Sequence, residues 1–195
     1  TLDITSQTWT WKDAVKLNMK NAAMTLSGFG QGFYVDGGSS IINSYLYMKE
    51  PGLRYGFLPW GRTGMTFQNG ASTVKGSTIR ADYGSNAGIS IGLGNSNTTM
   101  TFENSTLDFR NGGGSSGVGG AGGLNVNNGN ITLSNTTIKG NGDNSGALFG
   151  AQTNGTITLT NNSTVETPAS RNADNGLGQT GTNYVVTGGS HRIKY

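Results

Sequence analysis

The segment from residue 49 to residue 62 carries side chains well suited to binding chemistry. It places Arg54, Tyr55, Trp60 and Arg62 close together in sequence, beside the turn signal of Pro51 and Gly52. Exposed aromatic rings stack on the apolar faces of sugars, and guanidinium groups pair with carboxylate or sulfate groups. We therefore expect these two arginines and two aromatic residues to form a ligand-binding site on an elaborated loop.

Aromatic residues concentrate in the same part of the chain, where the first sixty positions hold ten of the seventeen. Two of them, Tyr45 and Tyr47, flank Leu46, so a strand would place both phenol rings on one face. One interpretation is that the early aromatic residues close the open end of an apolar core. The alternative is that they contact a ligand.

Catalytic chemistry is poorly represented. The single histidine, His191, has no diagnostic carboxylate, serine or lysine around it. The loop around Ser145 superficially resembles a serine-protease nucleophile loop, but nothing in the sequence positions His191 as its base. We expect no catalytic residues, no cofactor and no metal site.

Carboxylates are also too dispersed for polysaccharide cleavage, which requires them in clusters. The ten acidic residues are scattered, with no two adjacent. Asp108 and Arg110 share one face of a possible strand and are expected to form an ordinary surface ion pair. A carbohydrate-active enzyme is therefore the weakest of the functional alternatives.

A repeated unit organises the rest of the chain. The unit is clearest in residues 131–138. Apolar and polar residues alternate over the first four positions, Asn135 comes next, and two small polar residues and an apolar residue follow it. Similar units begin at residues 17, 65, 100 and 157. With residue 131 included, the five starts are separated by 48, 35, 31 and 26 residues. The longest gap predicts a hidden copy at 41–46.

The unit predicts a strand, a corner and the start of a second strand. Apolar residues at every second position favour a strand with one dry face, and asparagine tolerates the left-handed conformation of a tight bend. Because one unit cannot bury its own apolar face, recurrence at this spacing indicates stacked units. The predicted fold is all-β, a right-handed parallel β-helix in which 88–93 and 123–127 form another wall.

Threonine occupies the outward position between the two apolar residues in four of the five copies. Three of these residues are Thr101, Thr132 and Thr158. Stacked copies would align them in an outward row of hydroxyl groups, which is a possible surface for self-association.

Composition agrees with a slim core in one domain spanning 1–195, or a fragment of a longer one. Hydrophobic residues make up 33%, and there are 34 glycines and no cysteine. We divide the chain into irregular first turns at 1–64, regular turns at 65–169 and last turns at 170–195. No apolar run reaches the roughly 18 residues of a membrane span, so membrane insertion is not expected.

The charge distribution argues against nucleic-acid binding. Residues 1–80 carry eight lysines and arginines against four acidic residues, whereas residues 81–195 carry five against six. The formal net charge of +3 is therefore a mild excess at one end, not the dense basic stripe of a nucleic-acid interface.

The repeated units at 100–107, 130–138 and 157–165, the corners rich in Gly, Asn, Thr and Ser, and the lack of cysteine resemble passenger domains of bacterial autotransporters, including AIDA-like and pertactin-like adhesins. The resemblance implies a right-handed parallel β-helix, secreted or displayed at the bacterial outer membrane. It also implies adhesion and virulence, with a host-cell surface protein or glycan as partner. The alternative is a self-associating biofilm protein whose partner is another copy of itself.

Overall fold

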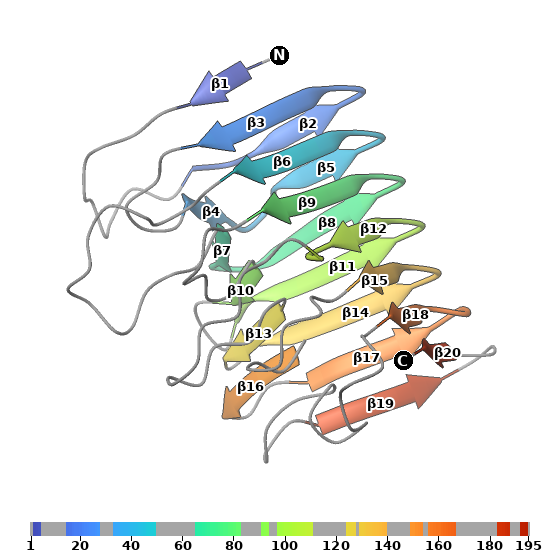
Figure 1. Ribbon diagram of the computed structural model, residues 1–195. Helices are drawn as coiled ribbons and strands as arrows, with labels where there is room; N and C mark the ends of the chain where they lie inside the picture. The colour runs from blue at the N-terminus through green and yellow to red at the C-terminus, as the bar shows by residue number, and fades with distance from the viewer. Residues whose placement is uncertain are drawn as a thin grey trace.

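The computed structural model of the chain is built from stacked strands. It describes residues 2–4, 15–27, 33–49, 65–82, 91–93, 97–110, 124–127, 129–139, 149–153, 156–166, 183–187 and 192–194. In these ranges β1 lies at one end of the stack and β20 at the other, and the strands between them follow in chain order (Figure 1). The described residues contain no helix.

Three parallel sheets contain all the described strands. Sheet A consists, in order, of β1 (Leu2–Ile4), β3 (Ala23–Ser27), β6 (Tyr45–Lys49), β9 (Thr78–Asp82), β12 (Thr106–Asp108), β15 (Thr137–Lys139), β18 (Thr164–Glu166) and β20 (Arg192–Lys194). Sheet B consists of β4 (Phe33–Asp36), β7 (Met65–Gln68), β10 (Ile91–Leu93), β13 (Leu124–Asn127) and β16 (Phe149–Thr153). Sheet C consists of β2 (Asn18–Lys20), β5 (Ser40–Ile42), β8 (Ala71–Lys75), β11 (Thr99–Glu103), β14 (Asn130–Ser134), β17 (Thr156–Thr160) and β19 (Asn183–Thr187).

From β4 to β18 the chain visits the sheets in a fixed order, B then C then A, and we call one such passage a coil. The strands β7, β8 and β9 form one coil, and β10, β11 and β12 form the next. Each strand pairs in parallel with its counterparts in the neighbouring coils. The prediction of an all-β chain is confirmed, and the three stacked parallel sheets have the arrangement expected of a parallel β-helix. Its handedness stays a prediction.

Alternation along each strand places apolar residues inside. Ile131 and Leu133 of β14 are buried, while Thr132 between them is half-buried on the outer face. In register, Met100 of β11 and Ile157 of β17 flank Ile131, so each coil adds one residue to a continuous apolar row. The core is therefore a narrow column that needs few apolar residues per coil.

At each of the six described corners from sheet C to sheet A, the first corner residue has a left-handed backbone with φ between 45° and 57°. At the last of these corners a second left-handed residue, Asn162 with a φ of 61°, follows it. Asparagine fills the position in all described coils but one, since its short side chain tolerates this conformation; glycine fills it in the coil of β8 and β9. The six residues are Asn21, Asn43, Gly76, Asn104, Asn135 and Asn161.

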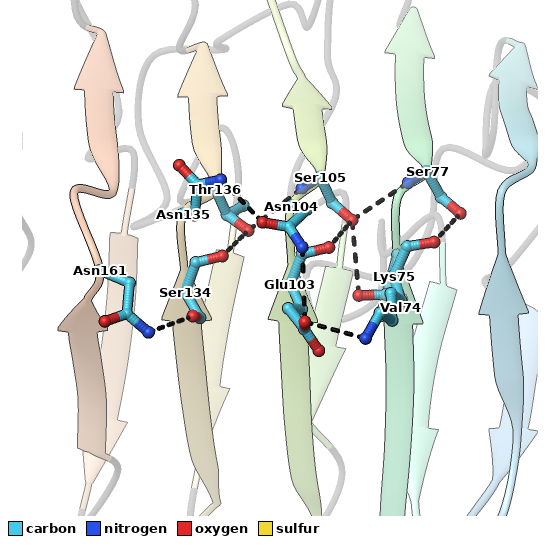
Figure 2. A network of polar contacts seen from close by, with 10 residues as sticks. All are labelled: Val74, Lys75, Ser77, Glu103, Asn104, Ser105, Ser134, Asn135, Thr136 and Asn161. Atoms are coloured by element: carbon cyan, nitrogen blue, oxygen red, sulfur yellow. Dashed lines mark hydrogen bonds and ion pairs between the residues drawn. The ribbon is translucent and has the colours of Figure 1, made fainter.

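A buried hydroxyl lies directly inside this corner, and we call the five stacked hydroxyls the hydroxyl column. They belong to Ser44, Ser77, Ser105, Thr136 and Ser163. The Ser105 hydroxyl accepts the backbone N–H of Ser77 from the preceding coil at 3.2 Å and donates to the Glu103 carbonyl at 2.8 Å (Figure 2). The same two contacts recur for Thr136, so at both corners the hydroxyl supplies the acceptor for a backbone N–H of the preceding coil.

Polar side chains link the coils on the outer side of the same corner. The Asn135 side-chain amide donates to the Asn104 side-chain oxygen at 2.7 Å (Figure 2). Lys75 and Glu103 form an ion pair at 2.9 Å between β8 and β11. The corner is thus held by one set of contacts inside and another outside.

The predicted units match the structure with one exception. The copies at 17–24, 100–107, 131–138 and 157–165 run from sheet C to sheet A, as does the hidden copy at 41–46. The copy placed at residue 65 is wrong, because Met65 and Phe67 belong to β7 of sheet B and align with Ile91 and Leu93. The true unit of that coil begins at Ser72, which aligns with Met100. Of the further wall predicted at 88–93 and 123–127, residues 91–93 and 124–127 are confirmed as part of sheet B, and the others lie outside the described residues.

Candidate functional site

The binding site predicted on the elaborated loop lies outside the described residues. This applies to Arg54, Tyr55, Trp60 and Arg62 alike. The same holds for His191 and for the loop around Ser145. The candidate surfaces below therefore come from the described walls of the stack.

The three threonines predicted to align do so. Thr101 of β11 lies opposite Thr132 of β14, and Thr132 lies opposite Thr158 of β17. Thr73 of β8 extends the row by one coil. We call these four residues the threonine row; all point outward from sheet C, between buried neighbours that are apolar except for Ser72 beside Thr73. Thr73 was missed because the unit of that coil was placed on β7.

A second row of threonines, on the outer face of sheet A, was also missed. It consists of Thr78, Thr106, Thr137 and Thr164, which are aligned in register and half-buried. The sequence signal was available, because each of these threonines follows the buried hydroxyl residue of the corner and precedes an apolar residue. The two sheets thus expose parallel rows of hydroxyl groups.

Two tyrosines, an arginine and an aspartate form the most concentrated group of functional side chains on sheet A. We call Tyr45, Tyr47, Arg80 and Asp82 the tyrosine cluster. Both tyrosines lie on β6 and flank buried Leu46, so the prediction that they share one face is confirmed. Both tyrosines point outward from the sheet. The interpretation that the early aromatic residues close the open end of the apolar core is therefore wrong for these two.

The neighbouring strand β9 fixes Tyr47 in place. The Tyr47 hydroxyl donates to Asp82 Oδ2 at 2.8 Å. Arg80 donates from Nε and Nη2 to the two oxygens of Asp82 at 2.9 and 2.6 Å, and its guanidinium carbon lies 5.2 Å from the centroid of the Tyr47 ring. The arginine is therefore held between a carboxylate and an aromatic face.

These contacts change the acid–base chemistry of the cluster. Burial raises the pKa of Tyr47 above its ordinary value, and the hydrogen bond to Asp82 adds to the effect because it stabilises the protonated phenol. The hydrogen bonds to Asp82 also raise the pKa of Arg80. The triad is thus a neutral phenol beside a balanced ion pair at physiological pH.

Tyr45 remains open to solvent at the edge of this triad. Its side chain is 39% exposed, and its ring centroid lies 6.5 Å from that of Tyr47 at an interplanar angle of 39°. The residues opposite Tyr45 in register are Ala23 on β3 and Thr78 on β9. Because both are small, the strands on either side leave part of the Tyr45 ring exposed.

The predicted ion pair between Asp108 and Arg110 is confirmed. Arg110 donates from Nε and Nη2 to the two carboxylate oxygens at 2.9 and 2.7 Å. These hydrogen bonds hold the pKa of Asp108 below its usual range. The ion pair stabilises the local surface structure. Because the pKa of Asp108 is lowered, this carboxyl group is a poor proton donor.

The described ranges show neither a metal-ligand group nor a membrane span. No three His, Asp or Glu side chains within them gather closely enough to hold a metal ion. Nor does any helix long and apolar enough for a membrane span occur in the part of the chain that the structure describes.

No protein-family profile, curated protein or solved structure matches this chain. The resemblance to autotransporter passenger domains therefore depends on the repeated units and their corner residues alone. The candidate surfaces must be argued from their own geometry.

Proposed function

We propose that this chain is part of a bacterial adhesin, secreted or displayed at the outer membrane, that binds a host-cell surface protein or glycan without catalysis. The β-helix acts as the rigid support, and the tyrosine cluster is a contact surface on one of its walls. The observation that carries the proposal is the exposed ring of Tyr45 beside the fixed triad of Tyr47, Arg80 and Asp82.

Two physical arguments support a binding role for this cluster. Tyrosine and arginine are enriched among the residues that dominate binding energy, because they combine apolar area with directed hydrogen bonds. Side chains already fixed before binding lose less conformational entropy when a ligand arrives. The contacts of Tyr47 and Arg80 supply this fixation, since they are made within the chain.

Cell adhesion tests the proposal. Beads coated with the 195-residue chain should adhere to cultured epithelial cells, and Tyr45→Ala should weaken the adhesion about tenfold because it removes the exposed ring. Binding is measured as bound beads against coating density. The matched control is Thr106→Ala, which changes a half-buried residue of the same sheet, two coils from Tyr45. Equal adhesion of wild type and Tyr45→Ala would remove the cluster from the binding surface.

A second candidate function is self-association, which the threonine row favours. Three of its members, Thr101, Thr132 and Thr158, are aligned in register and uncharged. Hydroxyl groups aligned at the spacing of neighbouring strands can pair with the same row of another copy through many small hydrogen bonds. This candidate uses sheet C, whereas the adhesin proposal uses sheet A.

A further inference from the structure

We infer that the tyrosine cluster is a subsite for one neutral hexopyranose unit of a glycan, whose apolar face stacks on the Tyr45 ring. The inference rests on the proposed adhesin function and names the class of ligand. It is argued from the charge balance of the cluster and from the residues around the exposed ring.

The charge balance disfavours cationic ligands. The guanidinium of Arg80 already occupies a face of the Tyr47 ring, at 5.2 Å from the centroid. Lys49 is exposed and lies opposite Asp82 in register. A cation stacked on either tyrosine would therefore approach two positive charges, which opposes cation–π binding.

The same balance disfavours anionic ligands. Both oxygens of Asp82 receive hydrogen bonds from Arg80, so Arg80 is already engaged in a bidentate ion pair. An incoming carboxylate or sulfate would have to share the guanidinium with the carboxylate of Asp82 and would be repelled by it. A neutral ligand is repelled neither by the two positive charges nor by the carboxylate of Asp82.

The form of the surface selects a sugar among neutral ligands. Tyr45 offers a partly exposed ring between Ala23 and Thr78, and Thr25 lies opposite Tyr47 in register. Beside it, Tyr47 contacts the guanidinium of Arg80 and the carboxylate of Asp82, so the surface suits a ligand with one apolar face and a polar rim. A pyranose has this form, because its axial C–H groups can cover the ring while its hydroxyl groups reach the rim.

The site would be shallow and open. Since Tyr45 is 39% exposed on a sheet face, it can contact one sugar ring but cannot enclose it. We therefore expect weak binding by a single subsite, strengthened when several copies of the chain meet a surface that carries many sugars.

Binding to immobilised oligosaccharides tests the inference. The wild-type chain is applied to neutral oligosaccharides that end in glucose, galactose or mannose, to sialylated and sulfated counterparts, and to a proline-rich peptide. The expected result is binding to at least one neutral sugar, about tenfold weaker for Tyr45→Ala and retained by Tyr45→Phe, which keeps the ring. Thr106→Ala is the matched control and should bind as wild type.

The outcomes separate the ligand class from the proposed function. Binding only to acidic sugars or only to the peptide overturns the neutral-sugar subsite, as does neutral-sugar binding that Tyr45→Ala leaves unchanged. If the chain adheres to cells but binds no sugar, the ligand class fails and the adhesin function stands. If it neither adheres nor binds a sugar, both fail. A thermal transition of Tyr45→Ala equal to that of wild type shows that its loss of binding is not a loss of folding.

Discussion

A single buried hydroxyl lies at five of the six described corners between sheets C and A. Ser105 shows how this works, because its oxygen accepts the N–H of Ser77 and its proton goes to the Glu103 carbonyl. The N–H of Ser77 depends on this hydroxyl at a bend that is 5% exposed at Ser105, whereas the Glu103 carbonyl also accepts the N–H of Gly76 at 2.9 Å. A buried polar group left without a partner costs about 1–3 kcal/mol, more than the hydrogen bond itself contributes net.

Replacement of this hydroxyl should therefore lower the free energy of unfolding, because it leaves a buried backbone group without its hydrogen-bond partner. Ser105→Ala is expected to lower the free energy of unfolding by about 1–3 kcal/mol, measured by urea denaturation. Ser105→Thr should stay close to wild type, because Thr136 makes the same contacts in the next coil. Thr101→Ala, on the outer face, is the control and should change little. An equal effect of the alanine and threonine substitutions at Ser105 would contradict the role of the hydroxyl.

The outer face of sheet A carries a row of alternating charges on neighbouring strands. Arg80, Asp108, Lys139 and Glu166 occupy one row on successive strands, so that each residue faces opposite charges in register. The positive charge of Lys139 contributes to the lowered pKa of Asp108. At the end of this row Tyr47 links β6 to β9 through its hydrogen bond to Asp82.

The link between β6 and β9 predicts a dependence on alkaline pH. The pKa of Tyr47 is raised in the folded state above its ordinary value of about 10. A raised folded pKa means that the contribution of Tyr47 to stability is fully present below about pH 10 and is lost as the pH rises through the folded value. Wild type should therefore be more stable than Tyr47→Phe at neutral pH, and this difference should disappear at alkaline pH. Thermal unfolding of both proteins from pH 7 to pH 12 checks it; a constant difference would contradict the link.

The whole molecule presents walls of different character. The central outward row of sheet A carries alternating charges from β9 to β18, whereas the threonine row at the centre of sheet C carries none from β8 to β17. Desolvating charges opposes close contact between copies, while hydroxyl groups can be paired at lower cost. If copies of this chain associate through a wall, sheet C is the better surface.

Sedimentation tests this difference between walls. If the second candidate function holds, the average mass of the wild-type chain rises with concentration, and Thr101→Lys with Thr132→Lys holds it at the monomer. The matched control places lysines at Thr106 and Thr137 on sheet A and should associate as wild type. A wild-type mass that stays monomeric at the highest soluble concentration, or equal association of both lysine variants, would exclude the threonine row as the contact.

The sequence was sufficient to predict the corners but not the pairing across coils. Alternation and asparagine marked five sheet C to sheet A corners correctly, and the shared face of Tyr45 and Tyr47 followed from their spacing alone. The unit at residue 65 was misplaced because alternation has the same period in every sheet, and because Asn69 has a positive φ at a different corner. The true unit was hidden by Ser72, a polar residue at an inward position. The contact of Tyr47 with Asp82 depends on a register between strands 35 residues apart, which no local pattern encodes.

The hydroxyl column also explains how coils of unequal length can share one stack. The hydrogen bonds from Ala22 to Ser44 and from Ser44 to Ser77 span 22 and 33 residues, yet each joins neighbouring coils at the same corner. From Ser44 to Ser163 the fixed element is one hydroxyl at each corner, whatever the length of chain between two corners. Insertions away from the corner can therefore lengthen a coil without breaking the stack, which leaves evolution free to vary the loops while the three walls keep their alignment.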